Sequence, residues 1–278
     1  MSDVLSGIEQ QQCPGLEREI IVVDSGSTDG TVDIAKAHGC RIEHISKENF
    51  SFGRSLNLGC AAATGDVFTI LSGHCITADN QWLANLTAPL IEGKVMWTYG
   101  RQMGNDGSRF SERRIFEKYF PPQSRIPQQG FFCNNANSAL LRQVWEQAPF
   151  DEELTGLEDM HLAKRLVSEG LKIGYVAEAA VYHLHDETWP QIKRRFERES
   201  IALQYIMPEI HLSSTDLLRY IASSILLDMG AALQKKEFVR HFGEIVMYRC
   251  AQYWGSYRGN NFHRKLSRER KEKYFYPK

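Results

Sequence analysis

The sequence predicts an α/β fold in which a sheet is flanked by helices and followed by a helical C-terminal part. Up to roughly residue 200, short β-favouring apolar runs alternate with segments of helical spacing, an order typical of such a fold. After residue 206 the apolar residues recur at helical spacing only. We therefore expect an α/β domain over residues 1–205 and a helical region with a basic tail over residues 206–278.

Composition and charge limit the classes of protein that fit. The 278 residues are 42% hydrophobic, enough for a full core, and a net charge of −1 gives no indication of nucleic-acid binding. Six cysteines without a Cys-x-x-Cys pair favour free thiols in a reducing cytoplasm. The N-terminus lacks a signal-peptide pattern, and no apolar run approaches the ~18 residues that a membrane span needs. A cytoplasmic location is expected.

The charge is unevenly distributed along the chain. Residues 258–278 contain eight Lys and Arg residues against two Glu residues. A basic tail on a near-neutral protein fits contact with an anionic surface such as the inner face of a membrane. A solvated chain end is the equally weighted alternative.

The first strand-loop-helix unit carries a carboxylate at the edge of the sheet. Ile20 to Val23 predict a buried strand that ends at Asp24. Small residues, among them Ser25 and Ser27, form a loop before a helix that begins near Thr31. In open α/β sheets, ligands bind at the edge where such loops lie.

The segment Ile-Val-Val-Asp-Ser-Gly-Ser-Thr-Asp-Gly-Thr closely resembles the nucleotide-binding signature of family 2 glycosyltransferases, in particular their rhamnosyltransferase-like branch. The resemblance implies a GT-A fold, which has a Rossmann-like mixed sheet. It implies that Asp24, with Ser25 and Ser27, binds the nucleoside of a nucleoside-diphosphate sugar. An ordinary strand-to-helix turn is the alternative. Relatives usually have a strand before this unit; either the chain starts late or it lacks that strand.

The next two elements contribute candidate phosphate and metal ligands. A strand over residues 41–45 is followed by a helix in which Arg54 could meet a pyrophosphate or could be a surface cation. A buried strand over residues 67–71 then ends in Ser72-Gly73-His74, where most relatives carry the metal-binding Asp-x-Asp. Both Ser72 and His74 are assigned to the donor site. His74 is either a lone ligand of Mn²⁺ or a direct donor to phosphate, since Mg²⁺ prefers carboxylate oxygen.

The middle of the chain is expected to line the sugar pocket. A helix over residues 82–90 and a strand over residues 95–102 precede a polar, proline-rich stretch over residues 103–130, read either as a lid or as a surface excursion. A strand over residues 129–141 resembles the family strand that lines the pocket. Asn135 and Asn137 point the same way along such a strand and offer amide donors and acceptors to sugar or acceptor hydroxyls.

The segment Glu158-Asp159 at the start of a predicted helix is the second specific match to the family. The resemblance implies that Asp159 is the general base for the acceptor hydroxyl and that Glu158 supports or orients it. A sugar hydroxyl is a poor nucleophile until its proton is taken, so the chemistry requires such a group. The alternative is a pair of acids that only stabilise a helix N-terminus.

The closing strands and the helix after them supply candidate groups for the diphosphate. Strands over residues 173–176 and 179–185 end near two histidines, of which His183 is favoured over His185. A basic helix follows, and Arg194 or Arg195 could stabilise the leaving diphosphate. The segment lacks the Gln-x-x-Arg-Trp of processive relatives, which argues against a polymer synthase.

Two further helices are predicted over residues 217–234 and 238–257, both apolar with interspersed Arg and aromatic residues. Packing on the core, dimerisation and binding to a membrane surface remain open for them.

Taken with the resemblance, these residues predict inverting transfer of a sugar from a nucleoside-diphosphate donor to a hydroxyl of a glycan or lipid-linked acceptor, in bacterial cell-surface polysaccharide synthesis. A divalent metal, Mn²⁺ or Mg²⁺, is the expected cofactor if one is used. The replaced Asp-x-Asp and the missing strand leave two alternatives. One is a catalytically impaired sugar-nucleotide-binding subunit. The other is a nucleotidyltransferase, for which no Gly-rich loop is visible.

Overall fold

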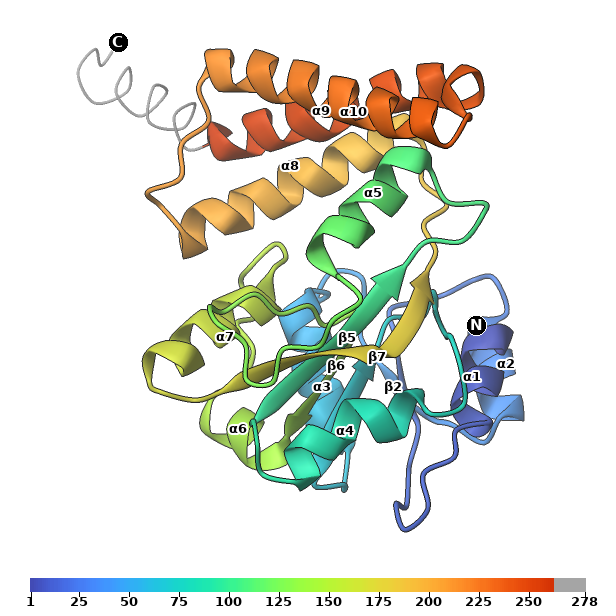
Figure 1. The fold of residues 1–278 in the computed structure, drawn as a ribbon. Helices are drawn as coiled ribbons and strands as arrows, with labels where there is room; N and C mark the ends of the chain where they lie inside the picture. The colour runs from blue at the N-terminus through green and yellow to red at the C-terminus, as the bar shows by residue number, and fades with distance from the viewer. Residues whose placement is uncertain (263–278) are drawn as a thin grey trace, which may run out of the picture. The chain divides into compact units, whose positions relative to one another are not determined.

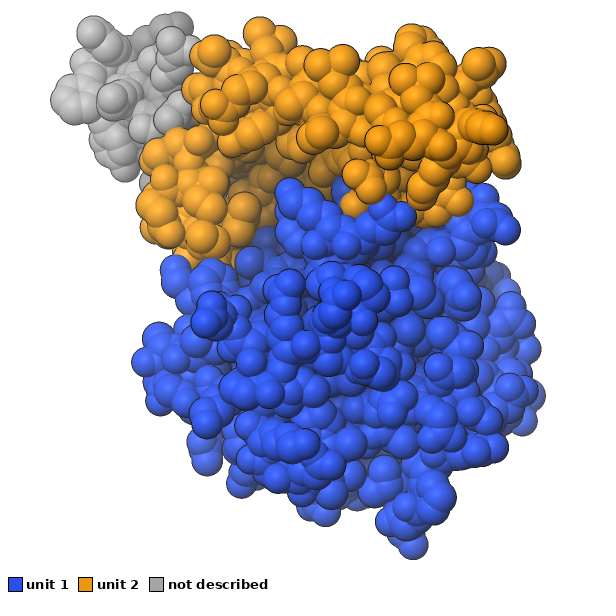
Figure 2. All heavy atoms as spheres, in the orientation of Figure 1, with its two compact units in different colours: residues 1–108, 115–185 blue, residues 109–114, 186–278 orange. Residues whose placement is uncertain are grey.

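The structure is a computed structural model that describes residues 1–262 (Figure 1). The chain forms two compact units, coloured separately in Figure 2. Of the described residues, unit 1 contains 1–108 and 115–185, and unit 2 contains 109–114 and 186–262. The division near residue 185 differs from the domain boundary expected at residue 205, because the helix that follows residue 188 packs within unit 2.

Unit 1 is an α/β structure. Its strands are β1 (Ile21–Asp24), β2 (Arg41–His44), β3 (Val67–Leu71), β4 (Cys75–Thr77), β5 (Trp97–Met103), β6 (Asn137–Leu141) and β7 (Ile173–His183). The helices that begin in it are α1 (Ser2–Glu9), α2 (Thr31–Ala37), α3 (Phe52–Ala62), α4 (Trp82–Ile91), α6 (Arg142–Gln147) and α7 (Glu158–Ser168). Helix α5 (Phe110–Tyr119) has its first turn in unit 2 and its remainder in unit 1.

The strands form two separate sheets. β1 and β2 pair in parallel, and the other strands form a five-stranded sheet in the order β3-β6-β5-β7-β4. That sheet is mixed, since β5 and β7 run parallel while the remaining pairs are antiparallel. Buried aromatic residues such as Trp97 and Tyr175 fill one core cluster, and Trp82 with Leu86 of α4 anchors a second. The apolar runs of the sequence therefore form the strands that they predicted.

Several local expectations need correction. Only residues 137–141 of the expected strand over residues 129–141 are β6, so Asn135 lies before the strand rather than within it. The two closing strands are one continuous strand, β7. The proline-rich stretch packs through Phe116 and Phe120 into the core of unit 1. β4 and α6 were not expected, because elements of 3 and 6 residues carry too little periodicity.

Close backbone contact between β5 and β7 depends on Gly100. A Cβ at this position would lie 2.1 Å from the carbonyl oxygen of Ala179 and 2.4 Å from Nδ2 of Asn137. We expect Gly100→Ala to lower the free energy of unfolding by about 3 kcal/mol or more, because neither backbone nor a buried amide can yield. Chemical denaturation measures this. Gly65→Ala is the control, since its Cβ would meet nothing nearer than 3.8 Å, and an equal loss in both variants would contradict the prediction.

Unit 2 contains three long helices, α8 (Trp189–Ile206), α9 (Ser214–Gln234) and α10 (Phe238–Asn260). Glycines of α10 allow it to approach α8 closely. Cβ atoms at Gly255 and Gly259 would lie 2.3 Å from the carbonyl oxygen of Lys193 and 2.1 Å from that of Glu197. This contact assigns α8 to unit 2. Among the residues described, no helix combines the length and the apolar character needed to cross a membrane.

Candidate functional site

The loop after β1 is organised by the carboxylate of Asp24. The backbone N–H of Gly26 donates to Oδ2 (2.9 Å), and that of Ser27 donates to Oδ1 (3.1 Å). His44 Nδ1 lies 3.5 Å from Oδ2. The hydrogen bond from the Ser27 side chain is the largest influence on the pKa of Asp24, and with the backbone N–H groups it lowers that pKa although burial opposes the shift. Asp24 is therefore a charged group that holds the loop, with Ser25 half-buried and Ser27 exposed beside it.

The lowered pKa of Asp24 makes stability depend on pH. Its contribution is fully present above the unfolded-state pKa of about 4 and is lost as pH falls through the lower folded-state pKa. We expect Asp24→Asn to cost about 1–3 kcal/mol near neutral pH, and the gap from the wild type to shrink at about pH 3. Denaturation at both pH values measures this. Asp33→Asn, at an exposed position of α2, is the control, and a gap independent of pH would contradict the assignment.

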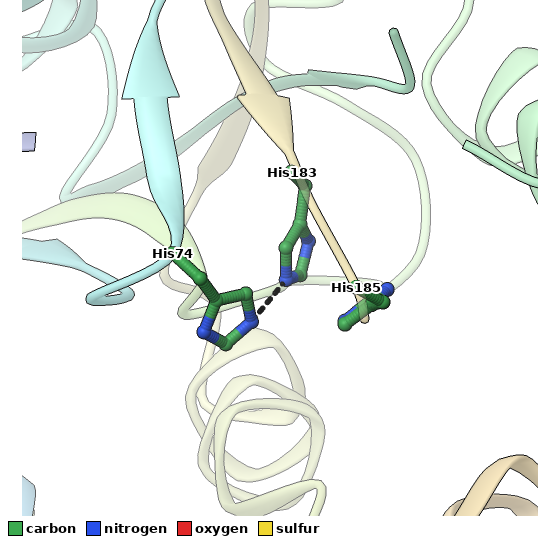
Figure 3. A group of neighbouring side chains, drawn as sticks. All are labelled: His74, His183 and His185. Atoms are coloured by element: carbon green, nitrogen blue, oxygen red, sulfur yellow. Dashed lines mark hydrogen bonds between the residues drawn. The ribbon is translucent and has the colours of Figure 1, made fainter. Parts of the chain in front are cut away.

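Three histidines of unit 1 come together at the ends of β3 and β7 (Figure 3). His74 follows β3, His183 is the last residue of β7, and His185 lies two residues further. Nε2 of His74 and Nε2 of His183 are 2.9 Å apart, and one nitrogen from each of the three rings lies within 4.8 Å of the others. Phe116 stacks on His183 at 5.7 Å and 24°. Donor atoms this close can converge on a single ion after small ring rotations.

A chain of hydrogen bonds orients His183. The Ala136 N–H donates to the side chain of Asn134 (3.0 Å), which identifies the accepting atom as the amide oxygen Oδ1. The same oxygen accepts a hydrogen bond from the side-chain N–H of Gln102 (2.8 Å). Oε1 of Gln102 therefore faces His183 Nδ1 at 2.6 Å, and an amide oxygen can only accept. Nδ1 of His183 therefore carries a proton, and in the neutral ring Nε2 presents a lone pair towards His74.

The pair of imidazole nitrogens requires a proton or a cation between them. Two ring nitrogens at 2.9 Å repel each other if both present lone pairs. The Ser72 hydroxyl lies 3.1 Å from Nδ1 and 3.4 Å from Nε2 of His74, so it does not select one nitrogen of that ring. His183 has a polar partner on the side away from the contact, as metal-bound histidines in proteins do. Imidazole donors suit Mn²⁺ or Zn²⁺ better than Mg²⁺.

Asp159 and the segment before β6 form the second group of candidate residues. The Asn135 N–H donates to Oδ2 of Asp159 (2.8 Å), and the Met160 N–H donates to Oδ1 (2.7 Å). Asp159 is 5% exposed and Glu158 is 7% exposed at the first turn of α7. Burial raises the pKa of the neighbouring Cys133, and the charges of Asp159 and Glu158 raise it further. The carboxylate of Asp159 is thus held rigidly at a helix N-terminus, where negative charge is favoured.

The two candidate asparagines have different surroundings. Asn135 is 7% exposed, and its Oδ1 accepts from the Ser138 hydroxyl. Asn137 is 0% exposed, its Oδ1 accepts from Trp82 Nε1 (2.9 Å) and its Nδ2 donates to the carbonyl of Ala179 (2.9 Å). The Asn137 amide would have to break these hydrogen bonds to bind a ligand. In the structure it joins β6 to α4 and β7.

Two of the three candidate arginines, Arg54 and Arg195, are already engaged by protein groups. Arg54 donates to Glu152 (2.9 Å) and to the carbonyl of Asn49 (2.7 Å), and 37% of its side chain is exposed. In unit 2, Arg195 is paired with Glu187 at 2.7 Å and with Glu112 at 3.2 Å. Arg194 is exposed on α8. Arg195 therefore belongs to an ion-pair network within unit 2.

The structure thus brings His74 and His183 together and adds His185 to them, where the sequence had weighed the last two as alternatives. It also places Asn135 against Asp159 through a backbone hydrogen bond. Gln102 was missed, because a glutamine in a strand carries no sequence signal of its partner. The histidine convergence was likewise invisible, since it depends on the register of β4 with β7, in which Cys75 pairs with His183.

Comparisons with known proteins agree with this architecture. The family described as "Glycosyl transferase family 2" matches residues 3–147. The O-antigen chain rhamnosyltransferase RfbN of Salmonella typhimurium is 26% identical over 275 residues, which cover 91% of this chain and 86% of that protein. Mannosyltransferase PcManGT from Pyrobaculum calidifontis, in complex with GDP-Man and Mn²⁺, has a TM-score of 0.61 at 16% identity, covering 92% of this chain and 81% of the other.

A second solved structure has the same fold. Glucosyl-3-phosphoglycerate synthase from Mycobacterium tuberculosis, in complex with Mn²⁺, UDP-Glc and phosphoglyceric acid, has a TM-score of 0.53 at 20% identity, covering 73% of this chain and 75% of the other. At these identities the likeness concerns the fold. Together the two matches confirm the expected GT-A-like α/β fold.

Proposed function

The chain belongs to glycosyl transferase family 2, and from that premise we propose that this glycosyltransferase moves a sugar from a nucleoside-diphosphate donor to an acceptor hydroxyl with inversion at the anomeric carbon. The observation that carries the proposal is the buried carboxylate of Asp159, fixed by two backbone N–H groups. A general base takes the proton of the acceptor hydroxyl only when the two groups are correctly positioned. A carboxylate that is already fixed in place lowers the entropic cost of reaching that position.

The donor nucleoside is assigned to the loop after β1. Asp24 is charged and can accept hydrogen bonds from ribose hydroxyls or a base N–H. Ser25 and Ser27 add hydroxyls on the same loop. Arg54 supplies a guanidinium that could reach the pyrophosphate by exchanging Glu152 for a phosphate oxygen. The named complexes of the fold relatives contain GDP-Man and UDP-Glc, which supports a sugar nucleotide as donor without deciding which.

The histidine cluster is proposed to meet the diphosphate, through a divalent cation held by His74 and His183 with His185 as third ligand. Mn²⁺, the ion named in the complexes of both fold relatives, accepts imidazole ligands more readily than Mg²⁺ does. Such a cation would neutralise negative charge on the leaving diphosphate. Gln102 holds His183 in the tautomer that such binding needs. Arg194 and Arg195 remain proposals for the diphosphate, with Arg195 first having to leave its glutamate partners.

Inversion follows from a single displacement. Asp159 accepts the proton of the acceptor hydroxyl while the acceptor oxygen bonds to the anomeric carbon and the diphosphate leaves from the opposite face. Glu158, the other carboxylate in the first turn of α7, is stabilised by the partial positive charge of the helix N-terminus and is proposed to support or orient Asp159. The backbone N–H of Asn135 bonds Asp159, and its side chain is proposed to contact sugar or acceptor hydroxyls.

The acceptor is proposed to be a growing cell-surface glycan on a lipid carrier. Support comes from the likeness to RfbN, which is described as an O-antigen chain rhamnosyltransferase. The transfer reaction would then take place at the inner face of a membrane, where a lipid-linked acceptor is held.

The proposal is tested by incubating the full chain with UDP-, dTDP- and GDP-sugars, with Mn²⁺, with Mg²⁺ and with chelator. We expect release of nucleoside diphosphate from one nucleotide class, stimulated more by Mn²⁺ than by Mg²⁺. The anomeric configuration of the product, read by NMR, is expected to be opposite to that of the donor. Retained configuration would refute the single displacement, and failure to bind any sugar nucleotide would refute the assignment of Asp24.

A further inference from the structure

A groove between α8 and α10 lies wholly within unit 2. Its volume is about 580 Å³, and its lining residues are Trp189, Pro190, Lys193, Arg194, Glu197, Met247, Cys250, Ala251, Trp254 and Arg258. The apolar part comes mainly from α10, with Met247 48% and Trp254 45% exposed. The groove therefore presents apolar surface to solvent rather than to the core.

Positive charge lies beside this apolar surface. Lys193, Arg194 and Arg258 line the groove against one acid, Glu197, which lies 3.3 Å from Arg258. Trp189 is held in place by the guanidinium of Arg109, which lies 4.0 Å from its ring centroid. The groove thus combines two tryptophan side chains, three cationic side chains and the apolar side chains of α10. This combination suits an amphiphile that has an anionic head and a hydrocarbon chain.

Exposed apolar side chains extend beyond the groove. Ten of the sixteen large apolar side chains that are exposed among the described residues lie in residues 186–262. On α9 they are leucines, among them Leu226 and Leu227, each 69% exposed, and on α10 Val239 is 92% exposed. Exposed apolar side chains in this number favour an interaction region on unit 2.

We propose that this surface of α8, α9 and α10 binds an anionic phospholipid bilayer, with lipid headgroup phosphates at Lys193 and Arg258 of the groove and Trp254 and the exposed leucines among the acyl chains. The charge of the chain favours this occupant, because residues 263–278, which lie outside the described residues, add seven Lys and Arg against two Glu. A second copy of the chain is disfavoured as the occupant, because a dimer formed through this surface would bring the cations of both copies together. The cores of protein interfaces are also depleted of lysine. The inference goes beyond the transfer reaction and does not depend on it.

The test is co-sedimentation of the full chain with vesicles of phosphatidylcholine alone and of phosphatidylcholine mixed with phosphatidylglycerol. We expect binding to the anionic vesicles only, weakened by added salt. Lys193→Glu is expected to lower the partition coefficient by about fivefold or more, and Trp254→Ala is expected to lower it as well. Ile91→Ala, a 59% exposed position on α4 in unit 1, is the matched control and should bind as the wild type does.

Two further measurements separate the outcomes. Thermal unfolding and hydrolysis of a soluble sugar nucleotide without vesicles should match the wild type in both groove variants, so a failure of the transfer proposal would show as absent hydrolysis in all proteins. Equal binding to neutral and anionic vesicles, or unchanged binding of both variants, would overturn the inference. Light scattering that shows a dimer dissociated by Trp254→Ala would assign the surface to a second copy instead.

Discussion

Replacing Asp159 by asparagine is expected to lower kcat for sugar transfer by about 10³-fold, because the acceptor hydroxyl loses its general base. Both carboxylate oxygens accept a backbone N–H, from Asn135 and from Met160. The amide of the variant must turn its NH₂ group against one of these donors, which costs about 1–3 kcal/mol of stability. The rate is measured as release of nucleoside diphosphate in the presence of acceptor, at a temperature well below the melting transition of the variant.

The control for this experiment is Glu169→Gln, which removes a carboxylate at the exposed C-cap position of α7. It should transfer sugar as the wild type does. Binding of the donor, measured by calorimetry, should survive Asp159→Asn, because the nucleoside is assigned to the loop after β1. Undiminished turnover in Asp159→Asn would remove Asp159 from the mechanism and leave Glu158-Asp159 as acids of a helix N-terminus.

Changes at His74 are expected to alter the metal requirement as well as the rate. His74→Ala removes the partner that lies 2.9 Å from Nε2 of His183, and we expect a loss of roughly 10²-fold in kcat together with weaker Mn²⁺ binding. His74→Asp places a carboxylate where the resemblance to family 2 glycosyltransferases implies the second aspartate of Asp-x-Asp. Because Mg²⁺ prefers oxygen ligands, this variant should use Mg²⁺ better than the wild type does.

Calorimetric titration with Mn²⁺ and Mg²⁺ in the absence of donor gives a readout independent of turnover. His211→Ala, at an exposed position before α9, is the matched control and should leave both titrations unchanged. If His74→Ala binds Mn²⁺ as the wild type does, the cluster is no metal site. His74 would then act directly on phosphate, the alternative that the sequence left open, provided that turnover still falls.

The sequence alone was sufficient for the features that depend on short segments. Residues 20–31 contain the whole strand, loop and helix start around Asp24, and every bond found at its carboxylate comes from within that loop or from the adjacent β2. Glu158-Asp159 was likewise placed correctly at a helix N-terminus, because apolar spacing over one helix determines where that helix begins. The family and the enzyme class followed from these same two segments.

The tertiary structure decided whatever depends on residues far apart in the chain. The pairing of β4 with β7 brings His74 to His183, and Gln102 of β5 fixes the ring, although no local pattern links the three. Asn137 appeared suited to a ligand until its amide was found bonded to α4 and β7. Local sequence determines which face of a strand or helix is apolar, whereas the partner of each polar group depends on strand register and helix packing. That is why the sequence predicted the elements and the position of the proposed base Asp159, and only the fold assembled the histidine cluster.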